Sequence, residues 1–96
     1  MGIVNKLPKA REQLNQIVDY IASDNLPAAL KWLEEIEALF NLLSTQPLMG
    51  QELHTKRLGK LRRHMFGRYA IYFRPIQGGV EILRVIHSAR DQERLL

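Results

Sequence analysis

The spacing of apolar residues changes from a helical period to a period of two near the middle of the chain, and this change limits the possible folds. Before residue 46, apolar side chains recur at intervals of three and four residues, as on one face of a helix. From residue 60 onward, apolar and polar residues alternate, which is typical of half-buried strands. Helices followed by consecutive strands favour an α+β domain, with the helices on one face of an antiparallel sheet.

Two helices are predicted in the first half. The first begins at Pro8, whose missing N–H is harmless in a first turn. The break at Asn25 and Pro27 separates it from the second, which the Asn25 side chain is expected to cap. The inner face of the first helix carries Ala10, Leu14, Ile17, Val18 and Ile21, and that of the second carries Ala29, Leu33, Ile36, Phe40 and Leu43, widened by Trp32, Leu39 and Leu42. The short break predicts an antiparallel helical hairpin.

The strands are expected around residues 2–7, 60–65, 69–74 and 80–87, with the first at an edge of a curved, mainly antiparallel sheet. Residues 75–79 form a hairpin loop whose glycines allow positive φ. The last strand is apolar on both faces, which predicts a central position, with Val80, Ile82, Arg84 and Ile86 sharing one face. Tyr69 and Phe73 are predicted under the helices, whereas Tyr72 faces the other way, toward a partner. Ser88 and Asp91 resemble a capping box for a short C-terminal helix, and the whole chain, residues 1–96, forms one domain.

Charge is divided unevenly along the chain. Residues 1–48 contain four basic and six acidic side chains, and residues 49–96 contain ten basic and four acidic ones. No acidic residue occurs between Leu53 and Val80. One interpretation is a solvated face that keeps a small protein soluble. The other is a cationic sheet surface that attracts an anionic macromolecule.

Several classes of protein are not indicated by this sequence. The chain has no cysteine and three scattered histidines, which argues against disulfides and against a metal site. No apolar run approaches the length of a membrane span, and no signal-peptide pattern precedes the first helix. A cytoplasmic protein that needs no cofactor and does not contact a membrane is therefore expected. His87 beside Ser88 is interpreted as a strand end next to a cap rather than a catalytic pair.

The basic cluster supports more than one chemistry. It comprises Lys60, Arg62, His64, Arg84, His87 and Arg90. Such a group can bind RNA phosphates, stabilise the charge that develops when a phosphodiester is cleaved by its own 2′-hydroxyl, or dock an acidic peptide. The residues alone leave these three possibilities open.

In order and spacing, several segments resemble the RelE/ParE toxins of type II toxin–antitoxin operons. The match extends from about Leu7 to Arg94. The segments that carry it are Ala10, Leu14, Ile17, Tyr20-Ile21-Ala22, Asn25-Leu26-Pro27-Ala28-Ala29, Pro47-x-x-Gly50, Tyr69-x-Ile71-x-Phe73-Arg74 and Ile82-Leu83-Arg84-Val85-Ile86-His87-x-x-Arg90-Asp91. Where the family usually has Ser or Thr before the first helix, this chain has Leu7-Pro8.

The resemblance implies a cognate antitoxin of the ParD or RelB type, a role in plasmid stabilisation, and one of two targets. Toxins of the ribonuclease branch cut mRNA in the ribosome, and here Lys60, Arg62, His87 and Arg90 would form that catalytic set. Tyr69 stands in place of that branch's strand arginine, and Leu95-Leu96 provides no C-terminal aromatic residue. The His-Ser-Ala-Arg-Asp ending resembles the ParE branch, whose members act on DNA gyrase without established catalytic residues.

We therefore expect a ParE-like gyrase inhibitor without catalytic residues, with a RelE-like ribosome-dependent mRNA interferase as the alternative. A plain nucleic-acid-binding module, or a toxin that has lost its activity, is a third hypothesis. An acidic and apolar antitoxin segment is expected to cover the basic sheet. The residues predicted to bind partners are Arg57, Arg63, Arg68, Tyr72, Arg74 and Arg84.

Overall fold

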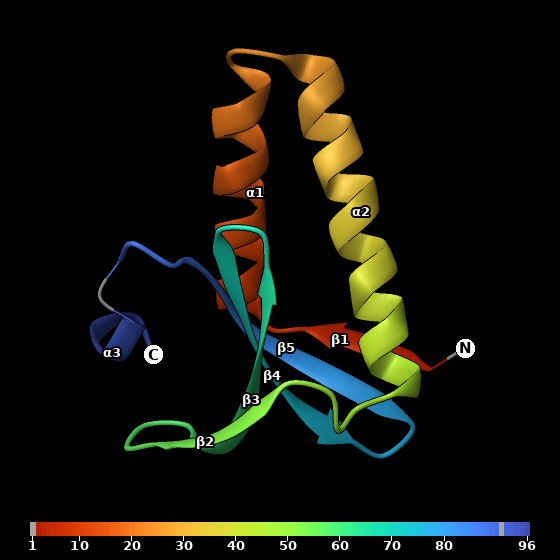
Figure 1. Ribbon diagram of the computed structural model, residues 1–96, viewed down its shortest axis with the longest axis vertical. Helices are drawn as coiled ribbons and strands as arrows, with labels where there is room; N and C mark the ends of the chain where they lie inside the picture. The colour runs from red at the N-terminus through yellow and green to blue at the C-terminus, as the bar shows by residue number, and fades with distance from the viewer. Residues whose placement is uncertain (1, 91) are drawn as a thin grey trace.

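In a computed structural model that describes residues 2–90 and 92–96, a helical hairpin packs on one face of a five-stranded sheet. The hairpin stands upright on the sheet and its tip extends well beyond it (Figure 1). The elements are β1 (Ile3–Lys6), α1 (Pro8–Ala22), α2 (Leu26–Thr45), β2 (Gln51–Thr55), β3 (Gly59–Phe66), β4 (Tyr69–Ile76), β5 (Gly79–His87) and α3 (Gln92–Leu95).

The strands are arranged in the order β1-β5-β4-β3-β2. Strands β2 to β5 pair antiparallel, whereas β1 pairs parallel to β5, with Val4 opposite Val80. The predictions that β1 is an edge strand, that the sheet is mainly antiparallel and that β5 is internal are confirmed. Strand β2 was not predicted, because Gln51–Thr55 has little apolar alternation; its position depends on pairing with β3.

The predicted helix boundaries are close to those observed. Asn25 caps α2 as expected, because its Oδ1 accepts a hydrogen bond from the Ala28 N–H at 3.1 Å. At the start of α1, Leu7 offers no side-chain cap, and Pro8 occupies the first turn. The Leu7 N–H donates instead to the Ile82 carbonyl at 2.9 Å, so the helix start is tied to the central sheet.

The sheet has an apolar core on each face. The larger core lies between the hairpin and the sheet, and its members include Leu14, Ile36, Phe40, Ile71 and Phe73. The smaller core, on the opposite face, contains Leu61, Ala70, Tyr72, Ile86 and Leu96, with Leu53, Leu58 and Leu95 packed against it. Since the C-terminal leucines cover this second face, β4 and β5 are buried on both sides. The composition predicted this for β5 alone.

A β-bulge changes which residues of β5 share a face. Tyr72 pairs with Arg84 but the next residue, Phe73, pairs with Ile82, so Leu83 is the additional residue of β5. Ile82 and Val85 therefore belong to the hairpin core, and Ile86 to the opposite one. The prediction that Ile82 and Ile86 share a face was wrong, because strict alternation does not continue through a bulge.

The C-terminal helix is a single turn. It runs over Gln92–Leu95, and Figure 1 shows it set apart from the hairpin, beside the sheet. The predicted capping box needs Asp91, which lies outside the described residues. Of the described helices, including the 20-residue α2, none combines the length and the apolar character needed to cross a membrane.

Gly50 and Gly59 provide a matched test of this fold. Both have positive φ, 82° and 72°. A Cβ on Gly50 would collide with the Arg63 carbonyl, whereas one on Gly59 meets no atom within 4 Å. We expect Gly59→Ala to reduce the free energy of unfolding by about 1–2 kcal/mol, the cost of a left-handed backbone for alanine, and Gly50→Ala to cost at least twice as much. Urea denaturation would measure both, and equal losses would contradict a steric role for Gly50.

Candidate functional site: a groove at the junction of the helices and the sheet

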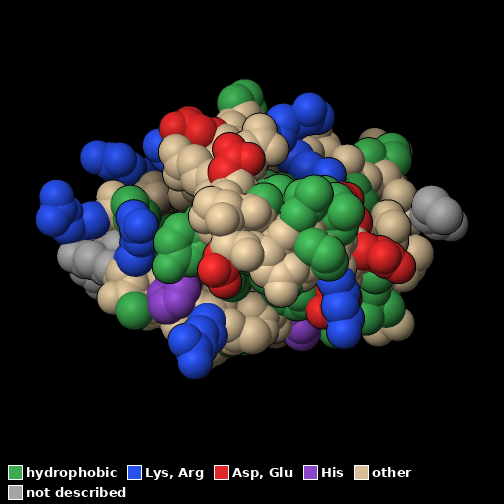
Figure 2. Space-filling view, turned by 90° about the horizontal axis from the view of Figure 1, so that it is seen from above, with side chains coloured by type: hydrophobic (Ala, Val, Ile, Leu, Met, Phe, Trp, Pro, Cys, Tyr) green, Lys and Arg blue, Asp and Glu red, His purple; other side chains and the backbone are tan. Residues whose placement is uncertain are grey.

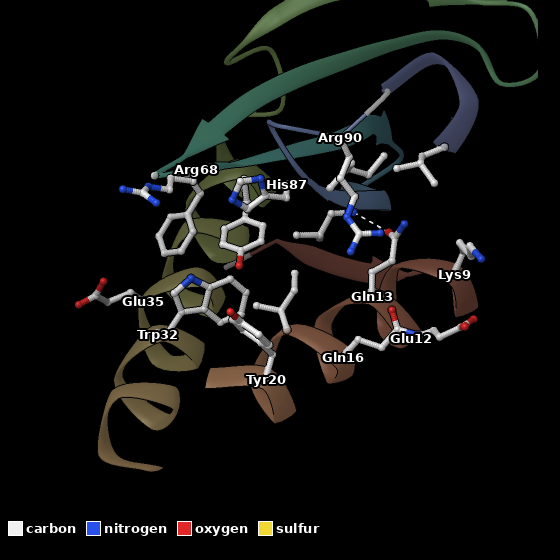
Figure 3. A pocket seen from close by; sticks show the side chains of 17 residues that line it. Lys9, Glu12, Gln13, Gln16, Tyr20, Trp32, Glu35, Arg68, His87 and Arg90 are labelled. Carbon is white, nitrogen blue, oxygen red and sulfur yellow. Dashed lines mark hydrogen bonds between the residues drawn. The ribbon is translucent and has the colours of Figure 1, made fainter. Parts of the chain in front are cut away.

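An open groove of about 1050 Å³ lies where α1 and α2 meet the end of the β3–β4 hairpin and of β5. Figure 3 shows Trp32 and Tyr20 on the helical side, with Arg68, His87 and Arg90 on the sheet side. The Tyr20 side chain is 77% exposed. The groove is therefore an accessible surface rather than an enclosed cavity, and its shape suits a segment of a macromolecule.

A row of aromatic rings forms one wall. Trp32 of α2 contacts Phe66 of β3 edge-on at 5.8 Å and Tyr69 of β4 at 5.4 Å, measured between ring centroids. Tyr69 contacts the His87 ring in the same way at 5.2 Å. The rings thus connect the helical hairpin to the end of the sheet, and they provide flat apolar contact area with little conformational freedom to lose on binding.

Gln13 of α1 completes the end of β5. Strand β1 ends opposite Ile82, so residue 85 has no neighbouring strand on that side. The Gln13 Oε1 accepts a hydrogen bond from the Val85 N–H at 2.7 Å instead, and a dashed line marks the contact beside Gln13 in Figure 3. A buried backbone donor is thereby satisfied, and α1 is fixed against the edge of β5 inside the groove.

Charge in the groove is divided between its two sides. Arg68, His87 and Arg90 come from the sheet side, and Glu12 and Glu35 from the helices, which also contribute Lys9. Within residues 2–90 and 92–96, no carboxylate forms an ion pair with Arg68 or Arg90. The lining on the sheet side therefore includes two guanidinium groups that the described carboxylates do not neutralise.

Arg62 is part of the fold rather than of a free cationic surface. Its Nε donates to the Met49 carbonyl at 2.9 Å, and its Nη2 to the carbonyls of Leu48 at 2.6 Å and Gly50 at 3.0 Å. Its Nη1 also lies 3.6 Å from Glu52. The guanidinium thus satisfies the carbonyls of the connection between α2 and β2, and a side chain 17% exposed has little capacity left for a ligand.

Other predicted cations also have internal partners. Lys60 pairs with Glu52 at 3.2 Å, and Arg74 lies 3.5 Å from Glu81. Arg63 donates to the Gln51 side chain at 3.1 Å. These contacts are local ones between neighbouring strands, so much of the basic sequence is used to hold the sheet together.

The cations do not share one face of the sheet. Arg62 pairs with Phe73 of the hairpin core, whereas Arg63 pairs with Tyr72 of the opposite core. In Figure 2 the Lys and Arg side chains are distributed around the outline, with acidic and apolar side chains between them. The expectation of a single cationic sheet surface was wrong, because adjacent residues of a strand point to opposite faces.

Arg84 and Arg57 lie on the side of the sheet away from the hairpin. Arg84 is half-buried and donates to the carbonyls of Leu83 at 2.7 Å and Leu95 at 3.3 Å. Burial of its guanidinium, and then the nearby charge of Arg57, lower the pKa of Arg84. Arg57 itself is exposed in the turn between β2 and β3. Neither cation is among the residues that line the groove, although Arg84 bonds to Leu95, which does line it.

Tyr72 is not on the surface. Its side chain is 1% exposed, and its hydroxyl donates to the Gln92 Oε1 at 2.7 Å. The expectation that it faces a partner was wrong for this structure. Tyr72 does lie on the predicted face of the sheet, but the C-terminal segment covers that face, and alternation along β4 gives no indication of such a cover.

The four residues of the alternative ribonuclease set lie in two places. His87 and Arg90 line the groove, whereas Lys60 and Arg62 do not. His87 is opposite Tyr69, which is opposite Phe66. Arg62 lies four residues from Phe66 along β3, about 13 Å at the usual rise of a strand. No group of three His, Asp or Glu side chains in the described part of the chain is arranged to hold a metal ion.

Sequence reasoning missed the helical side of the groove. Lys9, Gln13, Gln16 and Tyr20 all line it, and their spacing of four, three and four residues places them on one face of α1. These residues form a second, mostly polar stripe beside the apolar stripe of α1, and this pattern could have identified the helical side of the groove from the sequence. Trp32 was recognised only as part of the core.

Comparisons with known proteins agree with this fold. The family model described as the ParE toxin of type II toxin-antitoxin system, parDE, matches residues 4–92. A solved structure described as the chromosomal ParDE TA system from P. aeruginosa has a chain that is 21% identical, with a TM-score of 0.71. The alignment covers 91% of this chain and 96% of that one. None of the curated proteins matches.

The bonding of Arg62 predicts a large difference between two neighbouring cations. Arg62→Ala leaves three carbonyls without their donor and should reduce the free energy of unfolding by about 2–3 kcal/mol, as for hydrogen bonds to charged groups. Lys60→Ala removes only an exposed ion pair and should change it by less than about 0.5–1 kcal/mol. Chemical denaturation of both variants would measure these values. Similar values for the two variants would show that Arg62 is not structural.

Proposed function

Because the chain belongs to the ParE toxin family of type II toxin–antitoxin systems, we propose that it inhibits DNA gyrase by protein–protein contact and is neutralised by a cognate antitoxin. The observation that carries this proposal is the division of the basic residues. Arg62 is bonded to backbone carbonyls and Lys60 forms an exposed ion pair with Glu52, whereas Arg68 and Arg90 line an open groove.

The division argues against catalysis by the basic cluster. A side chain that acts as general acid or base must be within hydrogen-bond reach of the reacting group. Lys60 and Arg62 lie away from His87 and Arg90, and Arg62 is saturated by carbonyls. The groove instead offers features of a protein interface, namely aromatic rings in a row and two guanidinium groups. Aromatic and arginine side chains often supply most of the binding energy at such interfaces.

The groove also fits the expected chemistry of the antitoxin. A helical or extended segment can place apolar side chains against Trp32 and Tyr69 while its acidic side chains approach Arg68 and Arg90. If the segment bound in the reverse orientation, its acidic residues would lie near Glu12 and Glu35 on the helical side and would be repelled. The charge distribution thus favours one orientation of the bound segment.

The target is tested with a supercoiling assay. Addition of the purified chain to gyrase, relaxed plasmid and ATP is expected to reduce supercoiling and to trap cleaved DNA, and prior addition of the antitoxin should restore the reaction. Gel electrophoresis after protein removal measures both products. Unchanged supercoiling, together with codon-phased cuts in a ribosome-containing translation mixture, would replace gyrase by mRNA as the target.

The docking of the antitoxin is tested by reversing single charges. Arg68→Glu is expected to weaken antitoxin binding by about tenfold or more, because a like charge at a buried contact costs over 1.4 kcal/mol. Lys56→Glu is the matched control, since Lys56 is also an exposed basic turn residue but does not line the groove. Calorimetry would measure both affinities. Wild-type affinity of Arg68→Glu, or equal weakening by Lys56→Glu, would show that the groove is not the contact.

A further inference from the structure

His87 closes the turn that carries Arg90. It is the last residue of β5, and its side-chain Nδ1 accepts a hydrogen bond from the Ala89 N–H at 3.0 Å. Its carbonyl accepts a second one from the Arg90 N–H at 3.0 Å. Two backbone N–H groups of the turn that follows β5 therefore donate to His87, and Arg90 lines the groove directly after them. The Gln92 Nε2 also donates to the carbonyls of His87 at 2.8 Å and Arg90 at 2.9 Å, so among the described residues the Ala89 bond is the one hydrogen bond of this turn that uses the imidazole.

The orientation of the imidazole is fixed from two sides. Its ring packs edge-on against Tyr69, its cross-strand neighbour, at an interplanar angle of 85°. The adjacent Ser88 N–H donates to the Arg68 carbonyl at 2.7 Å, which holds the start of the turn against the β3–β4 connection. An imidazole nitrogen that accepts a hydrogen bond carries no proton, so the neutral ring in this turn has its proton on Nε2.

Protonation of this imidazole is incompatible with the turn as it stands. Both nitrogens of an imidazolium are donors, so an N–H at Nδ1 would face the Ala89 N–H. Figure 3 shows His87 between Arg68 and Arg90 on the sheet side of the groove. The other titratable groups of the groove are Tyr69 on β4, and Lys9, Glu12, Tyr20 and Glu35 on the two helices opposite. Histidine is the side chain that changes charge between pH 5 and 8.

We propose that His87 is a positioning residue that acts through Arg90. Its unprotonated Nδ1 closes the 87–90 turn and presents the guanidinium of Arg90 to the groove, and protonation opens the turn. The stabilisation is present while Nδ1 accepts the Ala89 N–H and is lost once acid places a proton on Nδ1. This consequence rests on the proposed function: if the groove holds the antitoxin, the affinity of the toxin for the antitoxin falls on acidification.

Two substitutions distinguish the effect of the hydrogen-bond acceptor of His87 from the effect of its aromatic ring. Asparagine at this position can accept the same type of bond from the N–H two residues later, as in an Asx turn, and it does not titrate. Phenylalanine keeps an aromatic contact with Tyr69 but has no acceptor. His87→Asn should therefore keep the turn closed at every pH, and His87→Phe should leave it open at every pH.

The turn is tested first in the free protein by NMR. Between pH 8 and pH 5.5 the Ala89 amide proton of the wild type is expected to move toward the random-coil shift in one step. In His87→Asn the Ala89 chemical shift should keep its hydrogen-bonded value at both pH values. In His87→Phe it should lie near the random-coil value at both. An Ala89 signal that ignores pH in the wild type, or that moves equally in His87→Asn, overturns the proposal.

The consequence for binding is tested with the purified cognate antitoxin. From pH 8 to pH 5.5 the wild-type dissociation constant should rise about three- to tenfold, the range for loss of one hydrogen bond. His87→Asn should lose this dependence, and Arg90→Ala should bind weakly with little dependence on pH. A pH dependence that persists in both variants overturns the role of His87. Absence of wild-type binding at pH 8 would overturn the proposed function instead, while the Ala89 signal still decides whether the turn titrates.

Discussion

The apolar contact between the helical hairpin and the two internal strands determines the rest of this structure. Ile36 and Phe40 of α2 and Leu14 of α1 pack against Ile71 and Phe73 of β4. Burial of such side chains contributes on the order of 1.5–3 kcal/mol each. This contact therefore fixes the position and the tilt of both helices relative to the sheet. Because the helices are longer than the sheet beneath them, they continue past its edge (Figure 1). The groove runs along α1 from Lys9 to Tyr20, between the helices and the ends of β4 and β5.

The same contact explains why the groove is lined with aromatic rings. Trp32 lies on α2 near the end of the shared core, where it touches the last residue of β3 and the first of β4. One face of that cluster belongs to the core and the other is open, so the rings are held in place before any partner arrives. Binding to a preorganised surface of this kind costs little side-chain entropy.

Several basic side chains of this chain form contacts within the fold. Arg62 replaces missing backbone donors in an irregular connection, and Arg74 and Lys60 pair with carboxylates on adjacent strands. A charge that already has a partner adds little to the attraction of a distant anion, and the Debye length of about 8–10 Å at cellular salt limits it further. Only a few cations line the groove. Because they lie at the site itself, they contribute more to the attraction of an anionic segment than the net charge of the chain does.

The sequence by itself determined the architecture. The periods of 3.6 and 2, the cap at Asn25 and the apolar composition of β5 specified a hairpin on a mainly antiparallel sheet, since each is a local consequence of backbone geometry. It also identified Arg68, His87 and Arg90 as notable residues. Only the tertiary structure decided which cations remain available, that Tyr72 is covered, and that Gln13 and Trp32 share a groove with His87. Those outcomes depend on register, on one bulge and on where the C-terminal leucines pack, and each of these arises from contacts between residues far apart in the chain.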